Sequence, residues 1–200
     1  ILNFNGHMLF EHTLIAALKS QCFNKIIITT DIDIPKKILK RYSKKVIFHE
    51  RPKKYCTDKS KALEVVNYYY KELSLEREKL GTISLLLATC PLRSADDIKK
   101  AFSTLKKNKK ADGIVSITDY GFPYKMSLNK NSKSFISPYW KNSPLINGNT
   151  RSQNHNPIFR PNGGFYIQYL NLQNIVHPNL CRVAKNLIQQ IGGYFFSFSA

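Results

Sequence analysis

The sequence predicts an α/β fold built on a doubly wound, mostly parallel sheet. Short runs of apolar, often β-branched residues alternate with amphipathic segments as far as Thr118. In addition, 42% of the 200 residues are hydrophobic, which is enough to bury one good core. Because strands that alternate with helices usually form parallel βαβ units with right-handed crossovers, we expect one domain spanning residues 1–200.

Four apolar runs predict the strands of this sheet. They are KIIITT (Lys25–Thr30), KVIFH (Lys45–His49), ISLLLA (Ile83–Ala88) and GIVSIT (Gly113–Thr118). The run at Leu85–Leu87 is continuously apolar, as expected of a central strand that is buried on both faces.

Amphipathic segments between these runs predict four helices, over Leu9–Ser20, Pro35–Tyr42, Asp58–Leu73 and Ala95–Lys107. Pro35 suits the opening turn of its helix, because the amide N–H that proline lacks has no intrahelical partner there. Ser94, in the segment SADD, predicts the N-cap of the last helix.

The chain after Tyr120 predicts loops and hairpins, because Pro, Asn, Ser and Gly interrupt short aromatic segments such as SPYWKNSPLINGN. This part of the chain holds several large aromatic residues in a loop-rich context: Phe122, Tyr124, Phe135, Tyr139 and Trp140. That is more aromatic surface than a small domain easily buries, which indicates a contact surface. We therefore expect an insertion at residues 120–150.

Ligands of open α/β sheets bind beyond the carboxyl ends of the strands. The segments TTDID, HERP, ATCPLR and TDYGFP all follow directly after expected strands. In ATCPLR, the small residues Thr89 and Cys90 would let a ligand approach the backbone. Arg93 would then lie at the mouth of the cleft, where its guanidinium suits a carboxylate or phosphate bidentately. An ion pair of Arg93 with Asp96 or Asp97 is the structural alternative.

The net charge of +18 is a weaker guide to function. Such a charge is typical of proteins that bind polyanions, but the Lys residues are spread over the whole chain. The densest cluster, KKNKK at Lys106–Lys110, falls at an expected helix end, where cations suit the helix dipole. We therefore regard nucleic acid as an unlikely partner. No apolar run reaches the roughly 18 residues of a membrane span, and we expect a soluble, cytoplasmic protein without membrane contact.

Metal-binding patterns are weak in this sequence. The four cysteines include no CxxC pair, and HMLFEH at His7–His12 matches neither spacing of a zinc-protease helix. We assign no metal ligand and no catalytic residue.

The chain resembles the acylneuraminate cytidylyltransferases, or CMP-sialic acid synthetases, including those that activate pseudaminic and legionaminic acids. LLLATCPLRSADDI resembles the family pattern LLQPTSPLRtaeDI, and RSQNHNPIFRPNGGFYI resembles RQdlpkvyRpNGaiYi. LNFNGHMLFEHTLIAALKS, IIITTDIDI and ERPKKYCTDKSKALEVV also match, in the family's order. The PLR and RPNG elements together make the resemblance specific.

The resemblance implies a Rossmann-like nucleotidyltransferase fold and transfer of CMP from CTP to a nine-carbon (nonulosonic) sugar acid, with release of pyrophosphate and with Mg²⁺ as cofactor. The product would serve cell-surface glycans such as lipopolysaccharide. A homodimer formed through residues 120–150 is also implied.

Carried over by position, the nucleotide would contact Arg51, Asp58 and Ser60. The sugar acid would contact Thr89, Arg93, Arg151, Gln153, Arg160, Asn162 and Phe165. Asp58 as a helix cap is an equally good interpretation, and Asn162-Gly163 could form a turn before a strand.

The chain also departs from the family pattern. The family's first strand with its phosphate loop, and its Asp-x-Asp metal motif, have no counterpart, so we expect a chain that is truncated at both ends. Ala88-Thr89 replaces the family's Pro-Thr, as in pseudaminic-acid enzymes, and the preceding Gln is absent, which leaves the sugar open. One competing hypothesis is a degenerate, non-catalytic paralogue that binds a sugar nucleotide or acts as a scaffold. Another is a basic nucleic-acid-binding protein, which only the net charge supports.

Overall fold

A computed structural model describes residues 2–31, 38, 40–42, 45–57, 59–72, 81–169 and 194–199. The chain divides into two compact units, which are described separately. The sheet unit comprises Ile1–Ser116 and Gly163–Ala200, and the small unit comprises Ile117–Asn162. Among the residues described, no helix has the length and apolar composition needed to cross a membrane.

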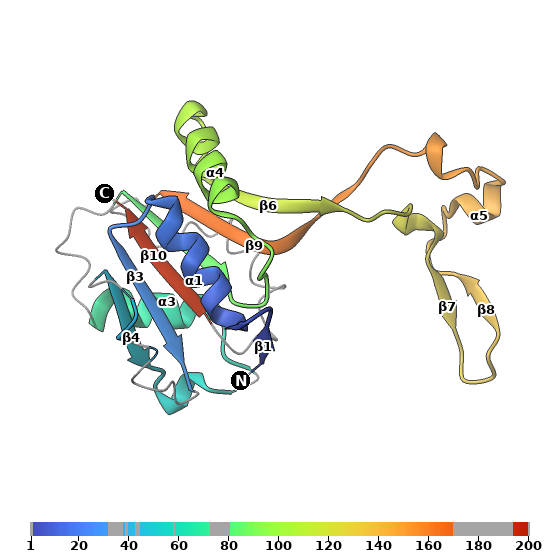
Figure 1. Ribbon diagram of the computed structural model, residues 1–200. Helices are drawn as coiled ribbons and strands as arrows, with labels where there is room; N and C mark the ends of the chain where they lie inside the picture. The colour runs from blue at the N-terminus through green and yellow to red at the C-terminus, as the bar shows by residue number, and fades with distance from the viewer. Residues whose placement is uncertain are drawn as a thin grey trace. The chain divides into compact units, whose positions relative to one another are not determined.

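A six-stranded sheet has the order β4-β3-β10-β5-β9-β6 (Figure 1). Its strands are β3 (Lys25–Thr30), β4 (Val46–Glu50), β5 (Thr82–Leu87), β6 (Gly113–Asp119), β9 (Phe159–Tyr169) and β10 (Tyr194–Ser199). The predicted strands are thus confirmed to within one residue at each end. β9 and β10 arise from parts of the chain where no strand was predicted in detail.

The directions of the strands correct the predicted mostly parallel sheet. β3 and β4 are parallel neighbours, with Ile26 opposite Val46. β10, however, lies between β3 and β5 and runs antiparallel to both, and β9 is antiparallel to β5. The sheet is therefore mixed, because two strands enter it in the opposite direction to the βαβ units.

Helices cover both faces of the sheet. Helices α1 (Leu9–Ser20) and α4 (Ala95–Lys107) pack on one face, and α3 (Ala62–Glu72) packs on the other (Figure 1). The alternation within β3 shows how the sequence achieves this, because Ile26 and Ile28 join the α1/α4 core whereas Ile27 joins the α3 core. All three Ile side chains are buried, as the apolar run predicted.

The helix termini follow their local sequence. Ser94 is the N-cap of α4: its Oγ accepts from the Asp97 amide at 3.1 Å, and the Asp97 carboxylate accepts from the Ser94 amide at 2.9 Å. The helix expected from Asp58 begins only at Ala62. A turn precedes it, in which the Ser60 amide donates to the Thr57 carbonyl at 3.0 Å. The helix predicted at residues 35–42 lies largely outside the described residues.

At the N-terminal end, β1 (Asn3–Phe4) and β2 (His7–Met8) form a hairpin that leads into α1. Its turn is Asn5-Gly6, with φ of 44° and 81°. This is the residue pair that tolerates two successive left-handed conformations best.

The small unit is made of short elements, as the turn-forming residues after Tyr120 predict. Strands β7 (Leu128–Lys130) and β8 (Ile136–Pro138) pair as a hairpin. The remaining elements are the 3₁₀ turns η3 (Tyr124–Met126) and η4 (Ser152–Asn154) and the short helix α5 (Pro144–Asn147). Ser143 joins two of them, because its Oγ donates to the Lys125 carbonyl at 2.8 Å and accepts from the Leu145 amide at 3.3 Å.

Candidate functional site

The carboxyl end of β5 is a point where three donors converge. Leu87 is the last residue of this strand, and its carbonyl accepts from Thr13 Oγ1 of α1 at 3.3 Å and from Arg93 Nη2 at 3.4 Å. The Cys90 amide also donates to it, at 3.3 Å, as the chain turns away from the sheet. This end of the strand, which the sequence marked as a candidate ligand site, is therefore held in place by side chains from two sides.

Strand β9 approaches the same point closely. A Cβ atom added to Gly163 would lie 3.0 Å from Leu87 Cδ1 and 3.6 Å from Cys90 Sγ, and Gly163 has a φ of +76°. Arg93 Nη1 also donates to the carbonyl of the next residue, Gly164. The ATCPLR and RPNGG segments, about seventy positions apart in the chain, thus meet at one junction. Sequence reasoning missed Thr13 and Gly163; the glycine pair in RPNGG was the signal that could have located the close approach.

Arg93 lies inside this junction rather than at a cleft mouth, which differs from the prediction. Only 8% of the residue is exposed, and its two terminal nitrogens donate to main-chain carbonyls. Burial lowers the pKa of the guanidinium to about 10, so Arg93 is charged at neutral pH. Of the alternative partners, Asp97 accepts from Ser94 and Asp96 lies 3.4 Å from Lys99 Nζ.

Two further predicted sugar-site residues lie next to this junction in the chain. Thr89 is exposed in the turn after β5. Phe165 is half-buried in β9, where its amide donates to Ser116 Oγ at 2.8 Å. Asn162-Gly163 is part of β9 rather than a turn before a strand, which corrects that interpretation.

The candidate nucleotide residues lie after β4. Arg51 is buried, and its Nη2 donates to the Thr29 carbonyl at the end of β3 at 3.0 Å. Ser60 is also buried, and its Oγ lies 2.9 Å from Thr57 Oγ1 and accepts from the Thr57 amide at 3.3 Å. Asp58 lies outside the described residues. Arg51 and Ser60 therefore hold local structure in the same segment, and their contacts with a nucleotide stay a prediction.

The other predicted sugar-site residues belong to the small unit and are exposed: Arg151, Gln153, Arg160 and Asn162. Asn162 Nδ2 donates to the Ile117 carbonyl at 3.5 Å, which joins the two chain segments that enter and leave this unit. The structure thus groups Thr89, Arg93 and Phe165 in one unit and these four residues in the other.

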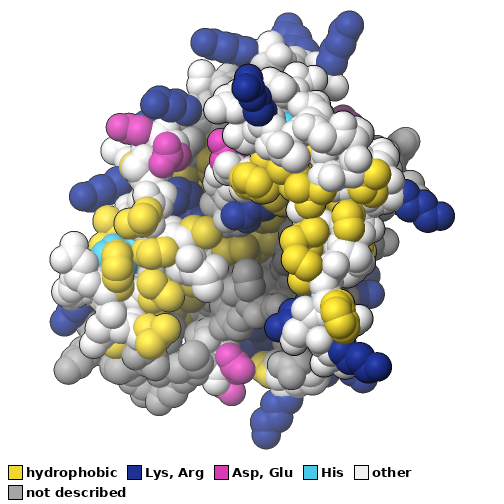
Figure 2. Space-filling model, turned by 90° about the vertical axis from the view of Figure 1, so that its right-hand side faces the viewer, with side chains coloured by type: hydrophobic (Ala, Val, Ile, Leu, Met, Phe, Trp, Pro, Cys, Tyr) yellow, Lys and Arg dark blue, Asp and Glu magenta, His cyan; other side chains and the backbone are white. Residues whose placement is uncertain are grey.

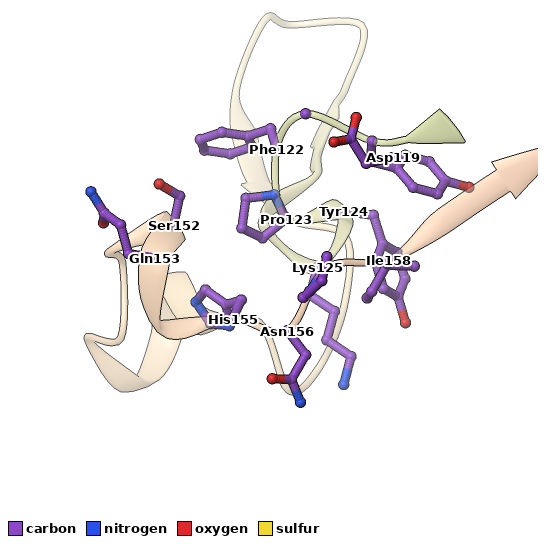
Figure 3. Close-up of a pocket in the computed structure, with 13 residues that line it drawn as sticks. Asp119, Phe122, Pro123, Tyr124, Lys125, Ser152, Gln153, His155, Asn156 and Ile158 are labelled. Atoms are coloured by element: carbon purple, nitrogen blue, oxygen red, sulfur yellow. The ribbon is translucent and has the colours of Figure 1, made fainter. Parts of the chain in front are cut away.

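The small unit also contains a groove of about 290 Å³ between residues 119–125 and 152–158. Figure 3 shows Tyr124 and Lys125 from the first segment and Gln153, His155 and Asn156 from the second around this groove. An aromatic ring beside amide, imidazole and ammonium groups is the kind of lining that holds a small polar ligand. Of the predicted sugar-site residues, Gln153 contributes to it.

The implied Mg²⁺ stays a prediction, and no described residue is assigned to it. Within the parts of the chain that the structure describes, no group of three His, Cys, Asp or Glu residues lies close enough together to hold a metal ion. In the HMLFEH segment, the Glu11 carboxylate accepts from the Met8 amide at 2.9 Å and from the Tyr42 hydroxyl. His12 Nε2 lies 2.7 Å from the Phe4 carbonyl oxygen. These contacts are structural.

The basic side chains are spread over the visible surface. Figure 2 shows Lys and Arg side chains all around this face of the molecule, with hydrophobic side chains exposed between them. A nucleic-acid site would require a basic patch or stripe on one face.

Comparison with known proteins identifies the family to which the chain belongs. A family described as Cytidylyltransferase matches residues 1–173. The chain is 27% identical over 169 residues to the N-acylneuraminate cytidylyltransferase of Escherichia coli O18:K1:H7, an alignment that covers 84% of this chain and 37% of that protein. It is 23% identical over 170 residues to the pseudaminic acid cytidylyltransferase of Campylobacter jejuni, covering 83% of this chain and 69% of that protein.

The chain therefore spans little more than a third of the length of the first relative. The family match, in contrast, includes most of its 200 residues and both segments that form the junction at the end of β5. The chain belongs to the cytidylyltransferase family.

Proposed function

We propose that the protein transfers CMP from CTP to a nine-carbon sugar acid of the sialic or pseudaminic type and releases pyrophosphate. Membership of the family implies a nucleotidyltransferase fold, and both relatives carry names of this activity. The observation that supports the proposal best is the junction between ATCPLR and RPNGG. The bond from Arg93 to Gly164 joins the two most specific segments of the resemblance at the carboxyl end of a central strand, which is where ligands of α/β sheets bind.

In the proposed reaction, the oxygen of the sugar's anomeric hydroxyl forms a bond to the α-phosphorus of CTP, and the hydroxyl proton is released to solvent. The bond from that phosphorus to the bridging oxygen breaks, and pyrophosphate leaves with its electron pair. The reaction depends on holding the two substrates in line. Mg²⁺, which the resemblance implies, would stabilise the negative charge on the phosphates of CTP when bound.

We assign the nucleotide side to the segment of Arg51, Asp58 and Ser60. For the sugar acid, Thr89 and Phe165 are the candidates in the sheet unit, and the exposed polar residues of the small unit are separate candidates. Among these, Arg151 and Arg160 are exposed arginines, which suit the carboxylate of the sugar acid because a guanidinium binds it through two parallel hydrogen bonds. The use of CTP places the proposed reaction in the cytoplasm, and its product would serve cell-surface glycans.

We further propose that the protein is a homodimer. The small unit exposes many large apolar side chains; Phe122 is 60% exposed, Phe135 69% and Ile136 66%. An exposed apolar surface of this kind on a small unit is typical of an interface between proteins.

The test uses the protein expressed from its complete reading frame. It is incubated with CTP, Mg²⁺ and either N-acetylneuraminate or pseudaminate, and pyrophosphate and the CMP-sugar are measured. Release of both products in equal amounts with one of the two sugars is expected. If neither sugar yields pyrophosphate but calorimetry shows that the CMP-sugar binds, the protein is instead a non-catalytic sugar-nucleotide binder.

A matched pair of variants tests the sugar side. Arg160→Met removes an exposed charge that we assign to the substrate, and Lys133→Met removes one from a hairpin loop of the same unit. Arg160→Met should raise the KM for the sugar acid by about 10-fold to 100-fold, because a hydrogen bond to a charged group contributes about 1.5–3 kcal/mol. The KM for CTP, and both constants of Lys133→Met, should stay unchanged. An equal rise in both KM values of Arg160→Met would count against this assignment.

A further inference from the structure

The Arg93 side chain is almost completely buried, and its guanidinium donates to main-chain carbonyls. Its Nη1 atom donates to the Gly164 carbonyl of β9, and its Nη2 atom donates to the Leu87 carbonyl of β5 at 3.4 Å. A single side chain therefore bridges the carboxyl end of β5 and the middle of the neighbouring strand β9. Because a guanidinium is planar and rigid, such a bridge fixes the spacing of the two carbonyls.

The same burial leaves little room for a ligand on this side chain. The residue is 8% exposed, and its Nε atom is buried with no hydrogen-bond partner among the described residues. Two of the five N–H donors of the guanidinium serve these carbonyls, so a sugar carboxylate could bind only by entering this buried space or by replacing one of the two carbonyl contacts. Replacing a contact of this kind inside the protein carries a desolvation cost.

Gly163 of β9 packs closely against Leu87 and Cys90 at the same junction. The position of a Cβ on this residue would be 3.0 Å from the Leu87 side chain and 3.6 Å from Cys90 Sγ. Leu87 is thus held through its carbonyl by Arg93 and packed through its side chain against Gly163. The Cys90 thiol is half-buried in the same turn, so the rate at which it reacts indicates whether the two segments stay together.

We propose that Arg93 is a positioning residue that ties the Thr89–Cys90 turn to Gly164 of β9, rather than a ligand of the sugar carboxylate. Its role in turnover rests on the proposed function, because the turn presents Thr89 and β9 presents Phe165 to the sugar acid. The junction itself does not depend on that function. A displacement of reacting groups by about 1 Å can lower a rate by up to about 100-fold, so the spacing of these two segments matters to the rate.

The first experiment measures the junction in the protein without any ligand. The rate at which iodoacetamide alkylates each cysteine is followed by peptide mass mapping in the wild type, Arg93→Met, Arg93→Lys and a control, Lys100→Met. The control removes an exposed charge on α4. The half-buried thiols of Cys22 and Cys56 serve as internal references.

Arg93→Met should raise the alkylation rate of Cys90 by about 10-fold relative to Cys22 and Cys56, because loss of the bridge favours local opening of the turn. Arg93→Lys should give a smaller rise, since one ammonium group does not reproduce the two-pronged bridge. Lys100→Met should match the wild type. An unchanged ratio in both Arg93 variants would overturn the proposal, and so would a parallel rise of all three cysteines, which would make Arg93 a general determinant of the fold.

The second experiment separates positioning from binding. With the CTP and sugar-acid assay, Arg93→Lys should lower kcat by about 10-fold or more and leave the KM for the sugar acid within about twofold. A raised KM with an unchanged kcat would instead identify Arg93 as a ligand of the sugar. If the wild type shows no activity, the proposed function fails while the alkylation ratios still decide whether Arg93 holds the junction.

Discussion

Thr29 Oγ1 donates a 2.8 Å hydrogen bond to the hydroxyl of Tyr69, which in turn donates to the Glu50 carbonyl at 3.1 Å. Thr29 and Tyr69 are both 0% exposed. One hydroxyl of α3 thus connects the ends of β3 and β4, immediately before Arg51. Arg51 adds a second link, because its Nη2 donates to the Thr29 carbonyl at 3.0 Å.

Tyr69→Phe should destabilise the protein by about 1–3 kcal/mol, because it removes the hydroxyl that satisfies buried Thr29 and leaves that group without its acceptor. Tyr68→Phe is the matched control. Tyr68 is half-buried on the same helix, and its ring contacts with Tyr55 and Tyr69, at 5.3 and 5.0 Å between centroids, are of a kind that Phe can also make. Urea unfolding measures both variants. Equal losses of unfolding free energy in the two variants would show that the Tyr69 hydroxyl makes no specific contribution to stability.

The same hydroxyl predicts a dependence on alkaline pH. Burial raises the pKa of Tyr69, an effect that outweighs the opposing hydrogen bond from Thr29. Because the folded protein holds this proton more tightly than the unfolded chain, the contribution to stability is complete below about pH 10 and is lost as the pH rises towards the raised pKa. The free energy of unfolding should therefore fall less steeply between about pH 9 and about pH 11 in Tyr69→Phe than in the wild type. Parallel pH profiles would contradict this prediction.

Gly163→Ala tests the close approach of β9 to β5. A non-glycine residue at a φ of +76° costs about 1–2 kcal/mol in backbone strain, and the added methyl would also meet Leu87 Cδ1 at 3.0 Å. Gly6→Ala is the control, since Gly6 has a φ of +81° but no atom within 4 Å of its added Cβ. Thermal unfolding should show a larger loss for Gly163→Ala than for Gly6→Ala. If Gly6→Ala lowers the unfolding temperature by as much, backbone strain alone accounts for the effect, and the contact with Leu87 adds nothing to it.

The local elements were predictable from the sequence, whereas the way they assemble was not. The limits of α1 agree with its apolar periodicity, and those of α4 agree with its periodicity and its Ser94 cap, because these signals are local in the sequence. The direction of β10 has no such local signal. YFFSFS alternates as a strand does, but its insertion between β3 and β5 depends on neighbours more than a hundred positions away in the chain.

The candidate site shows the same division. The sequence located the ATCPLR and RPNGG segments but placed Arg93 at a cleft mouth, because ATCPLR follows the carboxyl end of a strand, where ligands of α/β sheets bind. Its burial depends on the carbonyl of Gly164, which only the tertiary structure brings within reach. For the same reason, the hydrogen bond from Thr13 Oγ1 to the Leu87 carbonyl could not be predicted from the sequence of α1 alone.

The exposed apolar side chains of the small unit predict self-association. Phe135, just before β8, and Ile136, its first residue, are 69% and 66% exposed. A double change to Ser removes about 1.5–3 kcal/mol of burial free energy for each side chain that the partner would cover. Light scattering should give the wild type twice the mass of one chain and shift Phe135→Ser/Ile136→Ser towards the monomer. Leu2→Ser is the control, because Leu2 is 74% exposed but belongs to the sheet unit. A monomeric wild type would refute the homodimer. A double variant that stays dimeric would move the interface away from the β7–β8 hairpin.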